Sequence, residues 1–161
     1  MKQKAFNVLM LLAVCGLGML HYLDHTPNKD APKKVSDVKV VEVKPSFFTK
    51  SPKDGLKEAL GYYGVHHPEI VYAQAVLETG NFKSDLCING NNLFGLYNSR
   101  DNEYYTYTHW SESVKDYVDF IQYKYKPPNN YYKFLSDIGY AKDPNYIKKL
   151  KGIVNDKRRS E

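Results

Sequence analysis

The segment Pro68–Gly80, PEIVYAQAVLETG, predicts a helix with an unusual last turn. Proline is favoured at the first helical position, and glycine is favoured just after the last one. Val71, Ala75 and Glu78 are spaced i, i+4 and i+7, so they share one face of this helix. The spacing therefore predicts a carboxylate at the end of an otherwise apolar stripe, where carboxylates are uncommon.

This position has a chemical consequence for Glu78. An apolar setting and the negative end of the helix dipole both disfavour an ionised carboxylate, so we expect a raised pKa for Glu78. A carboxylic acid that stays protonated near neutral pH can protonate a glycosidic oxygen. The alternative on spacing alone is a partly exposed glutamate that pairs with Lys83 or caps a loop.

Further along the chain, short motifs follow one another in a fixed order. They are Ala73–Gly80 (AQAVLETG), Asn91–Gly95 (NNLFG), His109–Val114 (HWSESV), Asp116-Tyr117, Gly139–Ala141 (GYA) and Asp143–Tyr146 (DPNY). As an ordered set they resemble the glucosaminidase family, glycoside hydrolase family 73, also described as the mannosyl-glycoprotein endo-β-N-acetylglucosaminidase-like domain. The resemblance covers residues 55–154.

The resemblance implies a fold and an activity. The fold would be mostly α with a small β-hairpin lobe, an α+β, lysozyme-like domain around a glycan groove. The substrate would be peptidoglycan, cut after N-acetylglucosamine without a cofactor. Glu78 matches the catalytic acid of the family. Asn92, Phe94 and Gly95 match a loop that lines the groove, and Tyr140 matches an aromatic position on the substrate side.

A second catalytic group is harder to identify. Glycosidases commonly use two carboxylates, and we expect the second one to be Glu103, at the start of the predicted strand. Asp101 is the other candidate, and Glu112 fits better as a residue at a helix start. Three alternatives stay open: assistance by the acetamido group of the substrate, a lytic transglycosylase with one glutamate, and a wall-binding module without activity.

The remaining pattern is helical. The sequence predicts helices from Pro52 to Gly61 or Gly64, from a Ser111 cap to about 126, over 131–138, and from Asp143 to about 154. It also predicts a hairpin arm over 103–108. Adjacent His66 and His67 lack acidic partners at ligand spacing, so we expect no metal site. Cys87 fits a small half-buried residue.

Outside this domain, the ends of the chain differ in composition. The composition of residues 1–23 is typical of a signal peptide or membrane anchor, which would place the domain outside the cytoplasm. The composition of residues 24–51 is typical of a flexible linker. The domain would span 52–154, followed by a basic tail over 155–161. The net charge is +5, much of it near the C-terminus, and such a surface favours polyanions. No nucleic-acid motif accompanies it, and we expect a monomer.

Overall fold

A computed structural model describes residues 44–160 of the 161-residue chain. The predicted leader, residues 1–23, and most of the predicted linker, 24–51, lie outside this range. Within 44–160, no helix combines the length and apolar character needed to cross a membrane.

The described chain is mostly helical. Its elements are η1 (Ser46–Thr49), α1 (Pro52–Tyr62), α2 (Pro68–Glu78), α3 (Asp85–Ile88), β1 (Tyr97–Asn98), β2 (Glu103–Tyr104), α4 (Trp110–Phe120), η2 (Gln122–Lys124), α5 (Tyr131–Asp137) and α6 (Tyr146–Ser160). The two strands pair antiparallel, with Tyr97 opposite Tyr104. The expected mostly α architecture with a small β-hairpin lobe is therefore confirmed.

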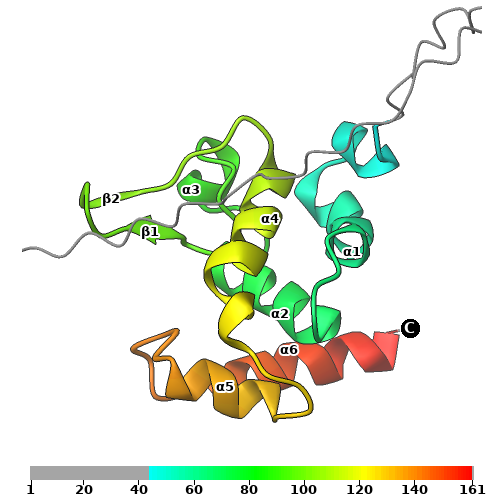
Figure 1. The fold of residues 1–161 in the computed structure, drawn as a ribbon. Helices are drawn as coiled ribbons and strands as arrows, with labels where there is room; N and C mark the ends of the chain where they lie inside the picture. The colour runs from blue at the N-terminus through cyan, green and yellow to red at the C-terminus, as the bar shows by residue number, and fades with distance from the viewer. Residues whose placement is uncertain (1–43, 161) are drawn as a thin grey trace, which may run out of the picture. The chain divides into compact units, whose positions relative to one another are not determined.

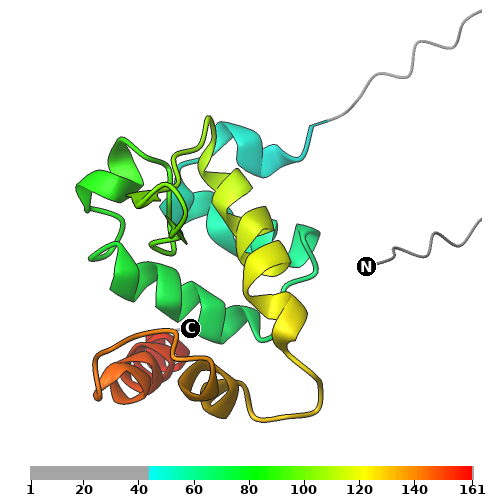
Figure 2. The ribbon, with the colours of Figure 1, turned by 60° about the vertical axis from the view of Figure 1, so that its left-hand side comes forward.

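Helix α2 occupies the centre of the domain. It packs against both α1 and α6, and Figures 1 and 2 both show α6 next to α2. Its buried residues are Ile70, Val71, Ala73, Gln74 and Ala75. Because α2 is buried on several sides, its C-terminal residue Glu78 is held on a rigid support.

Local sequence signals explain most helix starts. The side chain of Ser51 accepts a hydrogen bond from the backbone N–H of Asp54, with Pro52 at the first helical position, as predicted. The predicted Ser111 cap is wrong, because the cap of α4 is His109, whose ring accepts from the Ser111 N–H. An imidazole nitrogen can satisfy this N–H as an oxygen does, but cap preferences do not favour histidine.

The domain begins before the predicted boundary at residue 52. Phe47 in η1 is fully buried and lies 5.9 Å, ring centre to ring centre, from Trp110. The indole N–H of Trp110 also donates to the Lys50 carbonyl oxygen at 3.0 Å. The end of the expected linker therefore belongs to the core.

The predicted bounds or structure of three other segments need correction. Helix α4 ends at Phe120, and the expected continuation becomes the 3-10 turn η2. The strand predicted over 103–108 pairs only at Glu103–Tyr104. The expected basic tail is helical, since α6 continues to Ser160 with Leu150 and Val154 buried against the core.

Candidate active site

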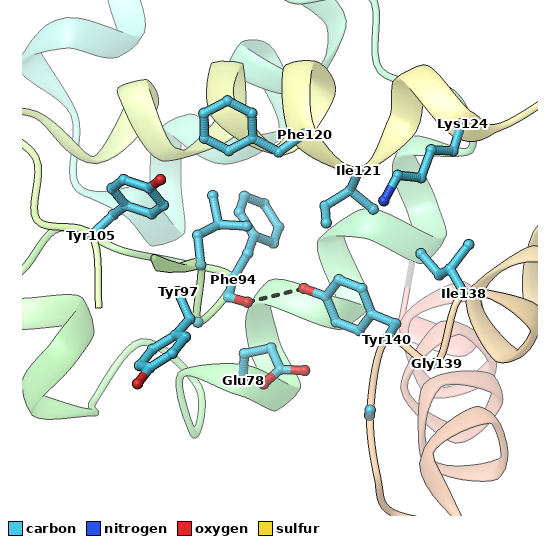
Figure 3. A pocket seen from close by; sticks show the side chains of 13 residues that line it. Glu78, Phe94, Tyr97, Tyr105, Phe120, Ile121, Lys124, Ile138, Gly139 and Tyr140 are labelled. Atoms are coloured by element: carbon cyan, nitrogen blue, oxygen red, sulfur yellow. Dashed lines mark hydrogen bonds between the residues drawn. The ribbon is translucent and has the colours of Figure 1, made fainter. Parts of the chain in front are cut away.

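A pocket of about 410 Å³ lies at the C-terminal end of α2. Its lining comes from four parts of the chain: Glu78, then Phe94–Tyr97 with Tyr105, then Phe120, Ile121 and Lys124, then Ile138–Ala141. Figure 3 shows Glu78 and Tyr140 on one side of the pocket and Phe120 on the opposite side. Aromatic side chains therefore surround a single carboxylate, and sugar rings pack well on such surfaces.

Glu78 is the last residue of α2, and its side chain opens into the pocket. By accessible area it is exposed, so it is not buried in the apolar stripe that the spacing suggested. The surrounding protein nevertheless removes part of its hydration and raises the pKa of Glu78. The expected direction of the pKa shift is confirmed, and its main cause is desolvation.

Tyr146, the first residue of α6, holds the Glu78 carboxyl in place. Its hydroxyl donates to Glu78 Oε1 at 2.7 Å, which favours the ionised form and partly offsets the desolvation. Burial and the neighbouring Glu78 charge in turn raise the pKa of Tyr146. Tyr146 thus stays a neutral donor across the physiological pH range.

A buried chain of hydrogen bonds continues from Tyr146 into the core. Gln74 Nε2 donates to the Tyr146 hydroxyl at 3.3 Å, and the Tyr117 hydroxyl donates to Gln74 Oε1 at 2.6 Å. The Tyr117 and Tyr131 hydroxyls are 2.8 Å apart, and Gln122 Nε2 donates to Tyr131 at 2.7 Å. One polar network therefore connects the Glu78 carboxyl to residues of five helical elements, α2, α4, η2, α5 and α6.

Asn92 was expected to contact substrate, but it is buried and does not line the pocket. Its side-chain oxygen accepts from the N–H groups of Phe94 and Leu96, and its side-chain nitrogen donates to the carbonyls of Leu96 and Tyr105. With these four bonds, Asn92 shapes the loop that approaches Glu78.

The other predicted residues of this loop do line the pocket. Gly95 has a φ of +62°, and a Cβ added there would lie 3.9 Å from Glu78 Oε2. A side chain at 95 would thus be strained and would narrow the approach to the acid. The Phe94 carbonyl accepts from the Tyr140 hydroxyl at 3.0 Å, which ties the loop to the segment before α6 (Figure 3).

Glu103, the expected second carboxylate, is exposed in β2 and is not among the residues that line the pocket. Asp101 accepts from Asn98 within the same hairpin, and Glu112 accepts from the Thr108 N–H at the start of α4. Glu78 is thus the single carboxylate among the described residues that line this pocket.

Sequence reasoning gave no role to three features of the pocket. In the sequence, Tyr146 is only the last residue of the Asp143–Tyr146 motif, because its contact with Glu78 depends on how α6 packs on α2. Lys124 is the one cation among the described lining residues, and it follows a helix end that the sequence placed later. Phe120 is 42% exposed at that end, which is unusual for a phenylalanine and consistent with a binding surface.

Other chemistries find no support in the described part of the chain. Between residues 44 and 160, no three His, Cys, Asp or Glu side chains are grouped to hold a metal ion. His67 Nε2 instead lies 2.8 Å from the Tyr125 hydroxyl. Cys87 is buried, and its burial raises the pKa of the thiol, which makes it a poor nucleophile.

Comparison with known proteins identifies a family. The family model described as mannosyl-glycoprotein endo-beta-N-acetylglucosaminidase, glucosaminidase, matches residues 53–159. Among solved structures, the catalytic domain of the autolysin Auto from Listeria monocytogenes is 20% identical with a TM-score of 0.48. That match covers 73% of this chain and 88% of the other. No curated protein matches the chain.

Proposed function

Because this chain belongs to the glucosaminidase family, we propose that it is a peptidoglycan hydrolase that cuts the glycan strand after N-acetylglucosamine, with Glu78 as general acid. The observation that carries this proposal is the setting of Glu78. It is a carboxyl with a raised pKa, open to an aromatic pocket and held by Tyr146.

In this proposal, Glu78 protonates the oxygen that leaves with the next sugar. A raised pKa increases the protonated fraction of the Glu78 carboxyl at any given pH, and the open pocket lets a glycosidic oxygen approach it. Tyr146 occupies Oε1, so Oε2, which faces Gly95, is the oxygen left for substrate. The proton would therefore be delivered from Oε2.

The remaining lining groups suit a glycan strand. Tyr97 and Phe120 are 46% and 42% exposed, and both are among the residues that line the pocket. Aromatic rings pack against the apolar faces of sugars. We propose that Tyr140 and the Phe94–Gly95 loop form the floor beneath the scissile bond, and that the substrate lies along the exposed rings.

The second catalytic group is a separate part of the proposal. Glu103 serves as this group only if the hairpin brings it toward Glu78. The single lining carboxylate instead favours help from the acetamido group of the substrate, or a transglycosylase outcome with an anhydro-sugar end. The transglycosylase route differs from the two hydrolytic routes in its anhydro-sugar product, and loss of activity in Glu103→Gln would distinguish the two hydrolytic routes from each other.

The test is digestion of purified peptidoglycan by the full chain, followed by mass spectrometry of the fragments. We expect fragments that end in reducing N-acetylglucosamine, and none from Glu78→Gln. Anhydro-muramic ends would identify a transglycosylase. Binding to the polymer without any fragments would instead support a wall-binding module and overturn the proposed activity.

A further inference from the structure

The positive charge of this chain is concentrated on one helix, and none of the basic residues of that helix lines the pocket described above. Helix α6 carries six basic residues against one acidic residue, Asp156. The basic residues are Lys148, Lys149, Lys151, Lys157, Arg158 and Arg159. The resulting net charge of +5 equals the formal net charge of the whole chain, so all other residues balance to zero.

The helical period places four of these cations on one exposed face. Lys148, Lys151, Arg158 and Arg159 follow one another at spacings that keep them on the same side of α6. The opposite side carries Leu150, which is fully buried against the core. We call the four exposed cations the α6 stripe, and this stripe faces solvent because the apolar side of α6 packs on α2.

Most of the stripe has no charge partner. Lys149, beside the stripe, pairs with Asp143 at 2.6 Å, and Arg159 reaches Asp156 only at 3.9 Å. Across residues 44–160, no ion pair neutralises Lys148, Lys151 or Arg158. Such a concentration of one sign of charge has an electrostatic cost, which a bound polyanion would relieve.

A hollow of about 440 Å³ lies beside the stripe, where α6 meets the starts of α2 and α5. Lys151 and Arg158 line it, and so do the side chains of Asn129, Asn130 and Asn155. Amide groups and cations together provide N–H groups that can donate hydrogen bonds to phosphate oxygens. The one acidic residue among the described residues that line this hollow, Glu69, has its Oε1 atom 3.8 Å from His67 Nδ1.

We propose that the α6 stripe and this hollow bind an anionic phosphodiester polymer of the cell wall. The stripe extends over the twelve residues 148–159, or about 16 Å, so a single phosphate cannot contact all of it, whereas a repeating polyanion can. Among the described residues, none of the exposed large apolar side chains lies on α6, which argues against insertion into a lipid surface. The choice of a wall polymer rests on the proposed function, because a domain that cuts peptidoglycan works among such polymers.

The test measures binding of the full chain to poly(glycerol phosphate), which contains no glycosidic bond. The test variant carries Lys148→Gln, Lys151→Gln and Arg158→Gln. We expect affinity to fall by about tenfold or more in this variant, and wild-type binding to weaken steeply with added salt. Hydrolysis of short uncharged glycan fragments should stay at the wild-type rate, because none of the three residues lines the catalytic pocket.

Two matched variants separate position from net charge. Lys53→Gln, Lys83→Gln and Lys126→Gln remove the same charge from exposed positions outside the stripe, and this variant should bind within about twofold of wild type. The exchange Lys148→Arg, Lys151→Arg and Arg158→Lys preserves the charge and should preserve binding. Retained binding here also shows that changes on this face leave the helix folded.

Three results would overturn the inference: no binding of wild type, an equal loss in the Lys53, Lys83 and Lys126 variant, or tighter binding to anionic phospholipid vesicles than to the polymer. Failure of the proposed hydrolase activity would look different. Peptidoglycan would then stay intact while poly(glycerol phosphate) still bound, because the binding assay involves no glycosidic bond.

Discussion

Helix α2 and the β1–β2 hairpin both contribute to the pocket, but they are built in opposite ways. The α2 side places Glu78 on a helix with five buried residues, and a buried network fixes its carboxyl through Tyr146. The hairpin side consists of two strands of two residues each, with Tyr97 and Tyr104 exposed. The acid is therefore rigidly positioned, while the hairpin wall has little packing that would hold it in one conformation.

The largest expected effect is a difference in catalytic rate between variants of Glu78, on α2, and Glu103, on the hairpin. Glu78→Gln should lower kcat on peptidoglycan by about 10²- to 10⁴-fold, because the proton donor is lost. Glu103→Gln should lower it by less than about tenfold, since Glu103 is exposed outside the pocket. Initial rates of both variants on one peptidoglycan preparation check this. An equal loss in Glu103→Gln would mean that the hairpin closes on the substrate and supplies a second catalytic group.

A smaller effect tests whether the buried network acts on the acid. Tyr146→Phe removes the hydrogen bond to Glu78, so we expect about a tenfold loss of kcat as the carboxyl loses its fixed orientation. The same bond lowers the pKa of Glu78, so its loss should raise that pKa further. The basic limb of the pH–rate profile should therefore move to higher pH.

The pH profile distinguishes positioning from a general loss of structure. Tyr63→Phe is the matched control, because the Tyr63 ring packs near Phe47 without contact to the pocket. It should leave both the rate and the basic limb unchanged. A Tyr146→Phe protein that is slower at every pH, with an unshifted limb, would contradict a role in tuning Glu78.

On the hairpin side, a change should affect substrate affinity more than stability. Tyr97→Ala removes an exposed ring that lines the pocket and contacts Tyr104 at 5.1 Å between ring centres. We expect KM to rise by about three- to tenfold, as for loss of one stacking contact. The free energy of unfolding should change by less than about 1 kcal/mol, because nearly half of the Tyr97 side chain is already exposed to water.

Tyr104→Ala serves as the comparison for this experiment. Tyr104 is 54% exposed in the same hairpin but does not line the pocket, so its loss should change stability similarly and KM little. Saturation kinetics give KM and denaturant unfolding gives the free energy of unfolding for each of the two variants. If both raise KM equally, the effect belongs to hairpin geometry, and Tyr97 makes no specific contact.

The same contrast explains what the sequence could predict. Helix α2 was placed closely because Pro68 and Gly80 mark its ends and its apolar face is buried. The predicted direction of the Glu78 pKa shift is confirmed, but its cause is desolvation by the surrounding protein and not burial within the apolar stripe of the helix. Asn92 was assigned to substrate because a motif gives a residue's identity without the direction of its side chain, and here that side chain turns inward to the loop.

Tertiary packing accounts for the features that the sequence left out. Tyr146 meets Glu78 across 68 positions of sequence, and only the docking of α6 on α2 brings them together. Phe47 lies in a stretch whose prolines and lysines are typical of a linker, yet contact with Trp110 draws it into the core. Local composition has no information about either contact.

The smallest expected effect concerns stability at the acid itself. A glutamate whose folded pKa is raised stabilises the fold below its unfolded pKa, near 4.3, and this contribution is lost as pH rises through the folded value. Glu78→Gln avoids that loss. The variant should therefore gain stability relative to wild type between pH 4 and pH 7, by less than about 1 kcal/mol because Glu78 is open to solvent.

Denaturant unfolding of both proteins at pH 4 and pH 7 measures this difference, and Glu103→Gln is the control. Since Glu103 lies outside the pocket, its replacement should give no such pH-dependent gain. A stability gain for Glu78→Gln combined with lost activity would mean that Glu78 lowers the stability of the fold while serving the reaction. Such a trade-off between stability and activity is expected of a catalytic residue. A loss of stability at pH 7 would instead assign Glu78 a structural role, and the rigid wall would then serve the fold more than the reaction.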